Sequence, residues 1–460
     1  MSDERLPVHL YGTLAGWLSG DDETTTFDWA PEAIGRWGVN SSVMSTSLPV
    51  GRAPEPGAPA NFFGGMLPEG IGLEKLAQTA QVGHRNIFGM YRLVGRDLAG
   101  ALVIGNAESS RGEAALLNPQ EIGVLLDNAS GYVIGGGGSA LPGFQRKITL
   151  TRLDGRWYRG GDEHASTHIL KPVATEYQTA AHCEDYTLRL SREIGLSDYE
   201  TWVEAIDGRH VLVIERYDRE IIDGAVQRIH QEDFAQASNL PWTGDDKFEQ
   251  NNDHASLRHL AQLLDSRRSI FSPAKTSDRE RLLQYTTFNV AVGNTDAHAK
   301  NHSMLRLSDG TSKLAPLYDA APLALDPDGR QTLAMFIGGN RFQWETSTAH
   351  LVSEGASWGI AEGRARDIVA ETLAQLEEAT YKVTADSSIE HRVPGYIRGQ
   401  ARNLANGKKA YMGRAGVPPH LQTAFGTPGA PGKTAAGAPE GEHFGIREQS
   451  EPDGPLAPEG

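Results

Sequence analysis

The sequence predicts an α+β fold in which a cleft separates a strand-rich lobe from a mainly helical lobe. Strand signals dominate from about residue 130 to 218, whereas helical patterns dominate from about residue 230 to 412. A run of strands followed by a run of helices is the pattern expected of this fold class. Residues 1–110 carry short strand patterns and apolar runs of their own, so we expect a small α+β domain ahead of the two lobes.

The C-terminal residues 416–460 differ from the rest of the chain in composition. Pro, Gly, Ala and Glu prevail there, and aromatic residues are nearly absent. Such a segment cannot bury enough apolar surface to offset its conformational entropy. We therefore expect 416–460 to be a disordered tail.

Composition is typical of a globular protein of the cytoplasm. The 460 residues are 39% hydrophobic and 22% charged, and no apolar run approaches the roughly 20 residues of a transmembrane helix. The N-terminus lacks the basic and then apolar plan of a signal peptide. The single cysteine, Cys183, excludes intramolecular disulfides and cysteine-cluster metal sites. We expect a cytoplasmic location and no membrane association.

The formal charge of −16 argues against a free-standing nucleic-acid binder. Neutralising the phosphates of DNA requires a concentrated face of Lys and Arg side chains. A local basic patch, or a partner protein that supplies the DNA contact, remains compatible with this charge.

The segment 293–302, Gly-Asn-Thr-Asp-Ala-His-Ala-Lys-Asn-His, carries the clearest chemical signal. Asp296 and Asn301 are five residues apart, the spacing at which phosphotransferases hold a catalytic base and a magnesium ligand. Asp and Asn beside Gly are also common turn formers, so taken alone the segment leaves that alternative open. His298 and His302 are four residues apart, but the Glu of the zinc motif His-Glu-x-x-His is absent.

A hairpin pattern follows this segment directly. Residues 303–307 and 312–317 have the pattern of two short strands joined by Ser-Asp-Gly-Thr. Because an antiparallel hairpin returns the chain to its starting point, Asn301 before the first strand is expected close to Asp319 after the second. A base and two oxygen ligands at the open end of a hairpin are typical of a magnesium–nucleotide site.

A glycine-dense loop over 135–143 lies between two strand patterns and leads into Phe144-Gln145-Arg146-Lys147. Glycines let backbone N–H groups approach phosphates without obstruction by Cβ atoms. The loop lacks the Gly-Lys-Ser/Thr ending of a P-loop, and by itself it is also compatible with a flexible turn.

The order of the following elements favours a nucleotide site. Residues 166–172 form a short strand pattern that contains Lys171, and a helix pattern with Glu184 near its start comes next. A strand lysine paired with a glutamate of the next helix orients nucleotide phosphates in protein kinases. A solvated helix carboxylate is the alternative for Glu184.

A buried strand pattern over 211–214 becomes polar at Glu215-Arg216-Tyr217. The connection between the lobes of a kinase presents backbone groups and an aromatic side chain to the adenine. Glu215 and Tyr217 are placed for that role, and an ordinary strand terminus is the alternative.

These segments, together with several others, match one family in collinear order. The other matching segments are Asn61-Phe62-Phe63, Leu67-Pro68-Glu69, Gly95-Arg96-Asp97, Gly100-Ala101 and His230-Gln231-Glu232-Asp233. Over about residues 1–412 the chain resembles the HipA-type serine/threonine kinases, the toxins of bacterial type II toxin–antitoxin pairs. The resemblance implies a two-lobed protein-kinase-like fold with a HipA-like N-terminal domain, a nucleotide-binding lobe over 125–228 and a catalytic lobe over 229–412.

The resemblance also implies roles for individual residues and two cofactors, ATP and Mg2+. Asp296 would accept the proton of the substrate hydroxyl, Asn301 and Asp319 would hold magnesium, and Lys171 would contact the α- and β-phosphates. The ATP site would be lined by Gly143, Phe144, Gln145, Arg146, Lys147, Lys171, Glu215, Arg216, Tyr217, His298, Ala299, Lys300, Asn301, Tyr318 and Asp319.

Family members imply partners and a form of self-control as well. The resemblance points to a protein substrate such as an aminoacyl-tRNA synthetase, and to a HipB-like helix-turn-helix antitoxin through which DNA is contacted indirectly. Members phosphorylate a serine three residues before the glycine matched by Gly143. Here that position is Ala140, and Ser139, one residue earlier, is the candidate for autophosphorylation.

Two other functions share this constellation of residues. One is phosphoryl transfer to a small metabolite, and the other is a non-catalytic co-repressor that binds an antitoxin and DNA. The presence of Lys171, Asp296, Asn301 and Asp319 together counts against the co-repressor, because a scaffold needs none of them.

Overall fold

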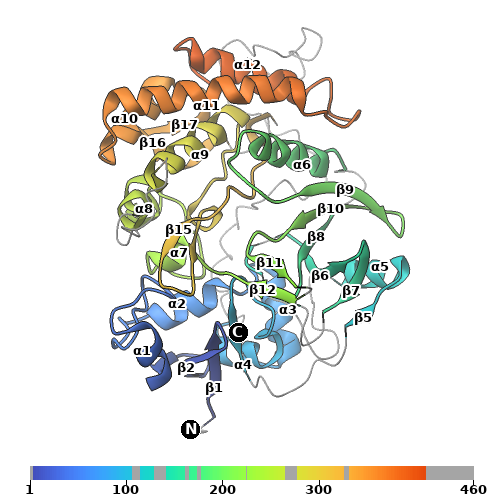
Figure 1. The fold of residues 1–460 in the computed structure, drawn as a ribbon, viewed down its shortest axis with the longest axis vertical. Helices are drawn as coiled ribbons and strands as arrows, with labels where there is room; N and C mark the ends of the chain where they lie inside the picture. The colour runs from blue at the N-terminus through green and yellow to red at the C-terminus, as the bar shows by residue number, and fades with distance from the viewer. Residues whose placement is uncertain are drawn as a thin grey trace, which may run out of the picture.

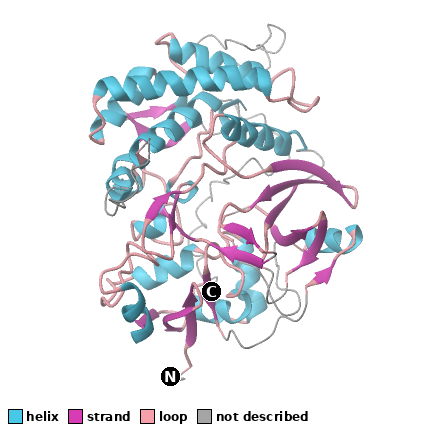
Figure 2. Ribbon diagram, in the orientation of Figure 1, coloured by secondary structure: helices cyan, strands magenta, loops and turns pink. Residues whose placement is uncertain are grey.

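The computed structural model describes residues 4–105, 114–128, 141–143, 145–160, 165–173, 178–223, 225–264, 277–325 and 331–410. In Figure 1 the N-terminal domain lies at one end of the long axis and helices α10, α11 and α12 lie at the other, with strands β6 to β10 between them. Figure 2 shows the long helices gathered at the end far from the N-terminus. Ser139, Phe144 and the segment 416–460 lie outside the described residues.

The N-terminal domain combines a four-stranded antiparallel sheet, ordered β3-β2-β1-β4, with four helices. Its elements are β1 (Leu6–Leu10), β2 (Thr13–Gly20), β3 (Thr25–Trp29), α1 (Pro31–Trp37), α2 (Ala58–Gly65), α3 (Ile71–Ala80), α4 (Ile87–Val94) and β4 (Leu102–Ile104). Tyr11 and Gly12 connect β1 to β2 with φ values of 50° and 74°. Two positive φ angles match the twist of a tight hairpin, and glycine adopts the second at no steric cost. Phe62, Phe63 and Tyr91 pack in the buried core of this domain.

The strand-rich lobe is built on a six-stranded antiparallel sheet with the order β5-β7-β6-β8-β10-β9. Its elements are β5 (Ala115–Leu116), α5 (Pro119–Asp127), β6 (Ile148–Leu153), β7 (Arg156–Arg159), β8 (His168–Val173), α6 (Gln178–Glu193), β9 (Thr201–Ile206) and β10 (Arg209–Glu215). Two of its hairpins turn at an Asp-Gly pair, Asp154-Gly155 and Asp207-Gly208, in which both residues have positive φ. This turn chemistry fixes the register of the strands that carry the site.

The helical lobe begins after the short hairpin of β11 (Arg219–Ile222) and β12 (Ala225–Arg228). Its helices are α7 (Phe234–Ala237), α8 (Leu257–Leu264), α9 (Asp278–Val292), α10 (Thr348–Ser357), α11 (Glu362–Lys382) and α12 (Val393–Ala405). Helix α9 begins with a capping box between Ser277 and Glu280, and it ends at Gly293 with φ 81°. A left-handed glycine at this position ends the helix cleanly, so the chain turns at once into the segment that carries Asp296.

Short strands lie in the part of the chain where the sequence indicated mainly helices. They are β13 (His230–Asp233), β14 (Ser303–Arg306), β15 (Ser312–Leu314), β16 (Thr332–Ile337) and β17 (Asn340–Phe342). The strands β14 and β15 match the hairpin that the sequence predicts, whereas β13 and β17 have only three or four residues, too few for periodicity to reveal in a window of 11 or more residues. The hairpin of β14 and β15 has the antiparallel pairing Met304↔Leu314 and Arg306↔Ser312, and β13 adds to its other edge.

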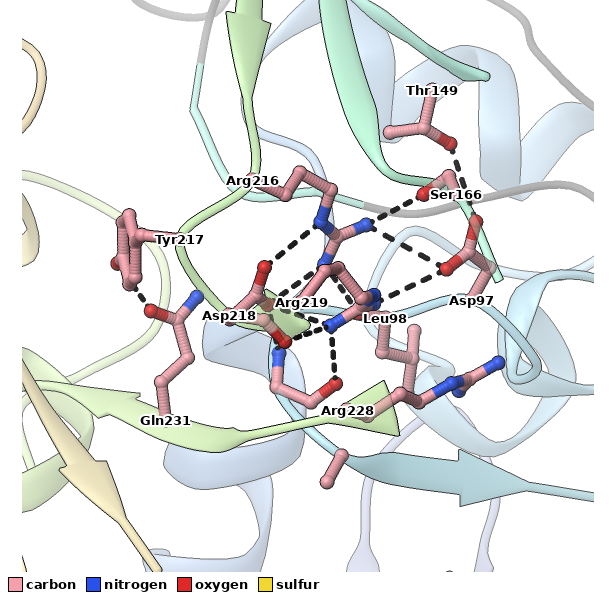
Figure 3. A network of polar contacts seen from close by, with 12 residues as sticks. Asp97, Leu98, Thr149, Ser166, Arg216, Tyr217, Asp218, Arg219, Arg228 and Gln231 are labelled. Carbon is pink, nitrogen blue, oxygen red and sulfur yellow. Dashed lines mark hydrogen bonds and ion pairs between the residues drawn. The ribbon is translucent and has the colours of Figure 1, made fainter. Parts of the chain in front are cut away.

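A buried ionic network joins the N-terminal domain to the connection that follows β10 (Figure 3). Arg216 donates to both carboxylate oxygens of Asp218, at 3.0 and 2.8 Å, and to the backbone oxygen of Leu98 at 2.9 Å. Arg219 forms ion pairs with Asp97 at 3.3 Å and with Asp218 at 3.0 Å. Because each buried charge has an opposite charge beside it, this junction avoids the large cost of an unpaired buried ion.

A second junction joins the same domain to the helical lobe. Glu232, which is fully buried, pairs with Arg306 and accepts hydrogen bonds from Ser45 Oγ at 2.7 Å and from the Thr46 N–H at 3.1 Å. The N-terminal domain is therefore tied to β13 and β14 of the helical lobe. In the described part of the chain, no helix is long and apolar enough to cross a membrane.

Candidate active site

A cavity of about 210 Å³ lies where the strand-rich lobe, the helical lobe and the N-terminal domain meet. Thirteen of the predicted site residues line it: Gly143, Gln145, Lys147, Lys171, Glu215, Arg216, Tyr217, Asp296, His298, Lys300, Asn301, Tyr318 and Asp319. Ala299 is fully buried and Arg146 is exposed, and neither is among the described residues that line the cavity. Segments that are distant in the sequence thus converge on one space.

Lys171 of β8 lines this space and lies between two carboxylates. Its Nζ lies 2.7 Å from Oε1 of Glu184 in α6 and 3.0 Å from Oδ1 of Asp319. The side chain of Glu184 is 6% exposed, whereas that of Asp319 is 45% exposed. The lysine therefore joins an enclosed carboxylate to one that opens into the cavity.

The charges of this group stabilise one another. Burial alone lowers the pKa of Lys171, but the carboxylates of Asp319 and Glu184 outweigh it and hold that pKa above its ordinary value. Burial alone raises the pKa of Asp319, yet Lys171 and then Lys147 bring it down to about 2. At neutral pH the pair is a charged ammonium and a charged carboxylate.

Asp319 has a left-handed backbone conformation with φ 54°. A non-glycine residue in this region costs of order 1–3 kcal/mol, and such strain clusters at functional sites. It lies directly after Tyr318, in the segment that follows β15. The hairpin of β14 and β15 therefore does return the chain to the cavity that Asn301 lines, as its sequence predicts.

Internal hydrogen bonds hold the segment between α9 and β14. The backbone oxygen of Asp296 accepts from the His298 N–H at 2.7 Å and from Nδ2 of Asn301 at 2.9 Å. Nδ2 of Asn294 donates to the backbone oxygen of Asp319 at 3.4 Å. The candidate base, the two candidate ligands and the turn that carries them are therefore one connected unit.

The two histidines of this segment do not share a helix face. Residues Ala299–Asn301 form a single 3₁₀ turn, and Nδ1 of His302 lies 3.2 Å from the backbone oxygen of His298. Burial lowers the pKa of His302 to about 4 and holds that of His298 well below its ordinary value. No group of three His, Cys, Asp or Glu side chains placed to bind a metal occurs in the part of the chain that the structure describes.

Tyrosines lie between the connection that follows β10 and the segment 293–302, which carries the candidate base. Tyr217 stacks on Tyr318 with ring centroids 5.5 Å apart, and it also contacts Tyr199 at 6.0 Å. The hydroxyl of Tyr318 donates to the backbone oxygen of Lys300 at 2.7 Å. Through Tyr318 this stack links the residue after β10 to Lys300, and both rings border the cavity.

Glu215 and Arg216, at the end of β10 and directly after it, make different contacts. Oε2 of Glu215 accepts from the Glu200 N–H at 3.0 Å, which fixes the end of the strand. The guanidinium of Arg216 points into the buried ionic network with Asp218, although the residue also borders the cavity (Figure 3). Its side chain is therefore engaged in joining domains.

The end of the glycine-rich loop reaches the same space. Gly143 has φ 109°, and a Cβ atom there would lie 2.9 Å from Nζ of Lys147. Burial, followed by the charge of Lys171, lowers the pKa of Lys147 to about 8. Lys147 donates to the backbone oxygen of Pro142, which ties this lysine to the described end of the loop.

Sequence reasoning missed several residues of the site. Glu69, from the loop between α2 and α3, lines the cavity and forms ion pairs with Lys247 and Lys300. Asn294 also borders the cavity. Leu67-Pro68-Glu69 was visible as a motif, but nothing in its local sequence indicates which distant cations it meets.

The donor set suits a magnesium–nucleotide complex. The carboxylate of Asp319 is a hard oxygen ligand, and because Nδ2 of Asn301 is engaged with Asp296, its amide oxygen is the atom that could bind a cation. Lys171 and Lys147 supply positive charge for phosphate oxygens. The residues present therefore fit Mg2+ and ATP.

Comparison with known proteins decides the family. The HipA N-terminal domain matches residues 6–105, and the HipA-like C-terminal domain matches residues 139–380, more than half of the chain. The chain belongs to the HipA family. It is 32% identical over 384 residues to "Putative kinase Y4mE" of Sinorhizobium fredii, which covers 79% of this chain and 90% of that protein.

Other members of the HipA family extend the comparison. The serine/threonine-protein kinase toxin HipA of Shewanella oneidensis is 26% identical over 345 residues, 72% of this chain and 78% of the toxin. The solved structure of Shewanella oneidensis HipA with HipB and operator DNA aligns with a TM-score of 0.72 and 22% identity, over 87% of this chain and 96% of that one. This likeness confirms the predicted two-lobed kinase-like α+β fold.

Proposed function

We propose that this HipA-family protein is an ATP-dependent serine/threonine protein kinase that acts as a bacterial growth-arrest toxin. The proposal is carried by the two ion pairs of Lys171. They join Glu184 to Asp319 in the cavity that Asp296 and Asn301 also line. A lysine paired with a helix glutamate, a base and two oxygen ligands are the parts that phosphoryl transfer requires. A protein that served only as a co-repressor would need none of them.

In the proposed reaction each residue has one task. Lys171 binds phosphate oxygens of ATP, and Tyr217 contacts the adenine. Asp296 accepts the proton of the substrate hydroxyl while the hydroxyl oxygen bonds to the γ-phosphorus of ATP. The bond between that phosphorus and the oxygen that leaves with ADP breaks. Asn301 and Asp319 would hold Mg2+, which neutralises charge on the phosphates when bound.

The substrate and partner are proposed from the family. The substrate is a protein such as an aminoacyl-tRNA synthetase, phosphorylated on serine, and the neutralising partner is a HipB-like helix-turn-helix protein. The HipA structure of Shewanella oneidensis, which contains HipB and operator DNA, supports such a partner. The formal charge of −16 favours DNA contact through the partner.

The test is phosphate transfer from labelled ATP by the purified protein in a dialysed bacterial extract. We expect label in protein serines, and we expect Asp296→Asn to lower the rate about 10²–10⁴-fold with ATP affinity within a few-fold. Asp309→Asn, the same change in an exposed hairpin turn, serves as the control. Label that enters only dialysable compounds added back to the extract would favour the metabolite phosphotransferase instead.

A further inference from the structure

The N-terminal domain supplies part of the catalytic cavity. Among the described residues that line the cavity, Met66, Glu69 and Ala99 belong to this domain. Glu69 lies in the loop between α2 and α3, and its backbone N–H donates to the oxygen of Gly143 at 3.3 Å. The loop thus reaches both the cavity and the end of the glycine-rich segment.

The carboxylate of Glu69 is shared between two lysines of the helical lobe. Its Oε2 lies 2.8 Å from Nζ of Lys247, and its Oε1 lies 3.0 Å from Nζ of Lys300. The three side chains are between 4% and 11% exposed. Burial alone raises the pKa of Glu69, but Lys300 and Lys247 outweigh it and hold that pKa below its ordinary range.

Lys300 belongs to the segment 293–302, which carries the proposed base, and Lys247 contacts that segment. Lys300 lies between Asp296 and Asn301, directly before the latter. The backbone oxygen of Lys247 accepts from the Ala299 N–H at 3.2 Å. Through two ammonium groups, one carboxylate of the N-terminal domain therefore holds the turn that carries the base and a metal ligand.

Helix α2 fixes the position of this carboxylate. A Cβ atom on Gly64 would lie 2.3 Å from the ring of Trp242, so α2 packs directly on that ring. The backbone oxygen of Phe62 accepts from Nε2 of Gln236 at 2.8 Å, and Nδ2 of Asn61 donates to Oδ1 of Asn239 at 2.9 Å. The loop that follows α2 thus starts from a firmly held helix end.

We propose that Glu69 is a positioning residue through which the N-terminal domain completes the kinase site. It keeps the Lys300 ammonium away from Asp296, the proposed base, which lines the same cavity. Without Glu69, Lys300 is drawn toward Asp296 and neutralises the base. The inference rests on the proposed kinase function and deepens it, because it makes the N-terminal domain part of the catalytic unit.

The test compares Glu69→Gln with Glu232→Gln. Both substitutions neutralise a buried glutamate of an ion pair at the boundary of the N-terminal domain, but Glu232 does not line the cavity as the structure describes it. We expect Glu69→Gln to lower kcat at least about 10-fold with KM for ATP within about threefold, as expected when transition-state interactions are lost. Glu232→Gln should leave kcat within about twofold, and Glu69→Asp should recover part of the lost rate.

A double-mutant cycle separates positioning from loss of stability. Lys300→Met removes the misplaced ammonium, so Glu69→Gln should cost much less kcat in that background than in the wild type. Equal and additive losses would contradict the proposal, as would a kcat within twofold of wild type for Glu69→Gln alone.

Amide hydrogen exchange across 294–302 gives a readout that is independent of phosphoryl transfer. We expect faster exchange in Glu69→Gln but not in Glu232→Gln, because only the former releases this turn. Unchanged exchange in Glu69→Gln contradicts the positioning role. A wild-type protein that transfers no phosphate contradicts the proposed function instead, so the two failures can be told apart.

Discussion

Replacing Lys171 with methionine should damage stability and activity by separable routes. The substitution keeps an unbranched side chain of similar length but removes the charge that Glu184 meets at 2.7 Å. Removing one partner of a buried ion pair costs about 3–5 kcal/mol, because the remaining charge is buried without compensation. We expect about 3 kcal/mol, the lower end, because Glu184 can take up a proton in the variant.

The loss should depend on pH in a defined direction. Burial raises the pKa of Glu184, and Lys171 opposes this effect, so the substitution raises the folded-state pKa further. A carboxyl whose folded pKa exceeds its unfolded value lowers stability as pH rises above the unfolded pKa, because the unfolded chain then releases a proton that the folded protein retains. The variant should therefore approach wild-type stability near pH 5 and lose it as pH rises toward 8, by up to about 1.4 kcal/mol per pH unit.

Urea unfolding of both proteins at about pH 5 and about pH 8 measures this difference. The double variant Lys171→Met with Glu184→Gln should recover most of the stability at about pH 8, because no buried carboxylate is left unpaired, yet it should remain inactive. A loss below about 1 kcal/mol with no pH dependence would refute the buried ion pair.

Three further outcomes follow from the site and its supports. Asp319→Ala should weaken Mg-ATP binding at least about 10-fold and Asn301→Ala somewhat less, because only the first removes a charged ligand; calorimetric titration showing unchanged affinity in both would contradict the ligand assignment. Gly293→Ala should destabilise the protein by about 2 kcal/mol, since the residue has φ 81° and its Cβ would lie 2.6 Å from Oη of Tyr396; an unchanged unfolding midpoint would count against this. Incubation with Mg-ATP should add one phosphate at Ser139 and lower activity, because a dianion there repels the nucleotide phosphates; intact mass and peptide mapping should find none in Ser139→Ala, and none in the wild type would exclude this self-inactivation.

The parts of the site that are local in sequence could be predicted from it. The hairpin signal around Asp309-Gly310 correctly indicated strands on both sides, now β14 and β15. The order of a strand lysine and a helix glutamate indicated the ion pair of Lys171 with Glu184, which the structure contains. These inferences rest on turn chemistry and on element order, which nearby residues determine.

The parts that depend on packing between domains could not be predicted. Glu69 meets Lys247 and Lys300 across 178 and 231 residues of chain, and a single sequence carries no signal for such a contact. Arg216 borders the cavity, and its guanidinium donates to Asp218 and to the backbone oxygen of Leu98 in the N-terminal domain, a contact that the local sequence does not indicate. Which of two roles a charged side chain takes depends on the partners that tertiary packing supplies.

The most direct test of the central claim is a phosphoproteome comparison after induction of the wild type and of Asp296→Ala in bacteria. The account predicts growth arrest with the wild type, together with serine phosphorylation of a small set of proteins that is absent with the variant. Identical phosphoserine profiles in the two strains, with growth arrest in both, would contradict a protein kinase that depends on Asp296.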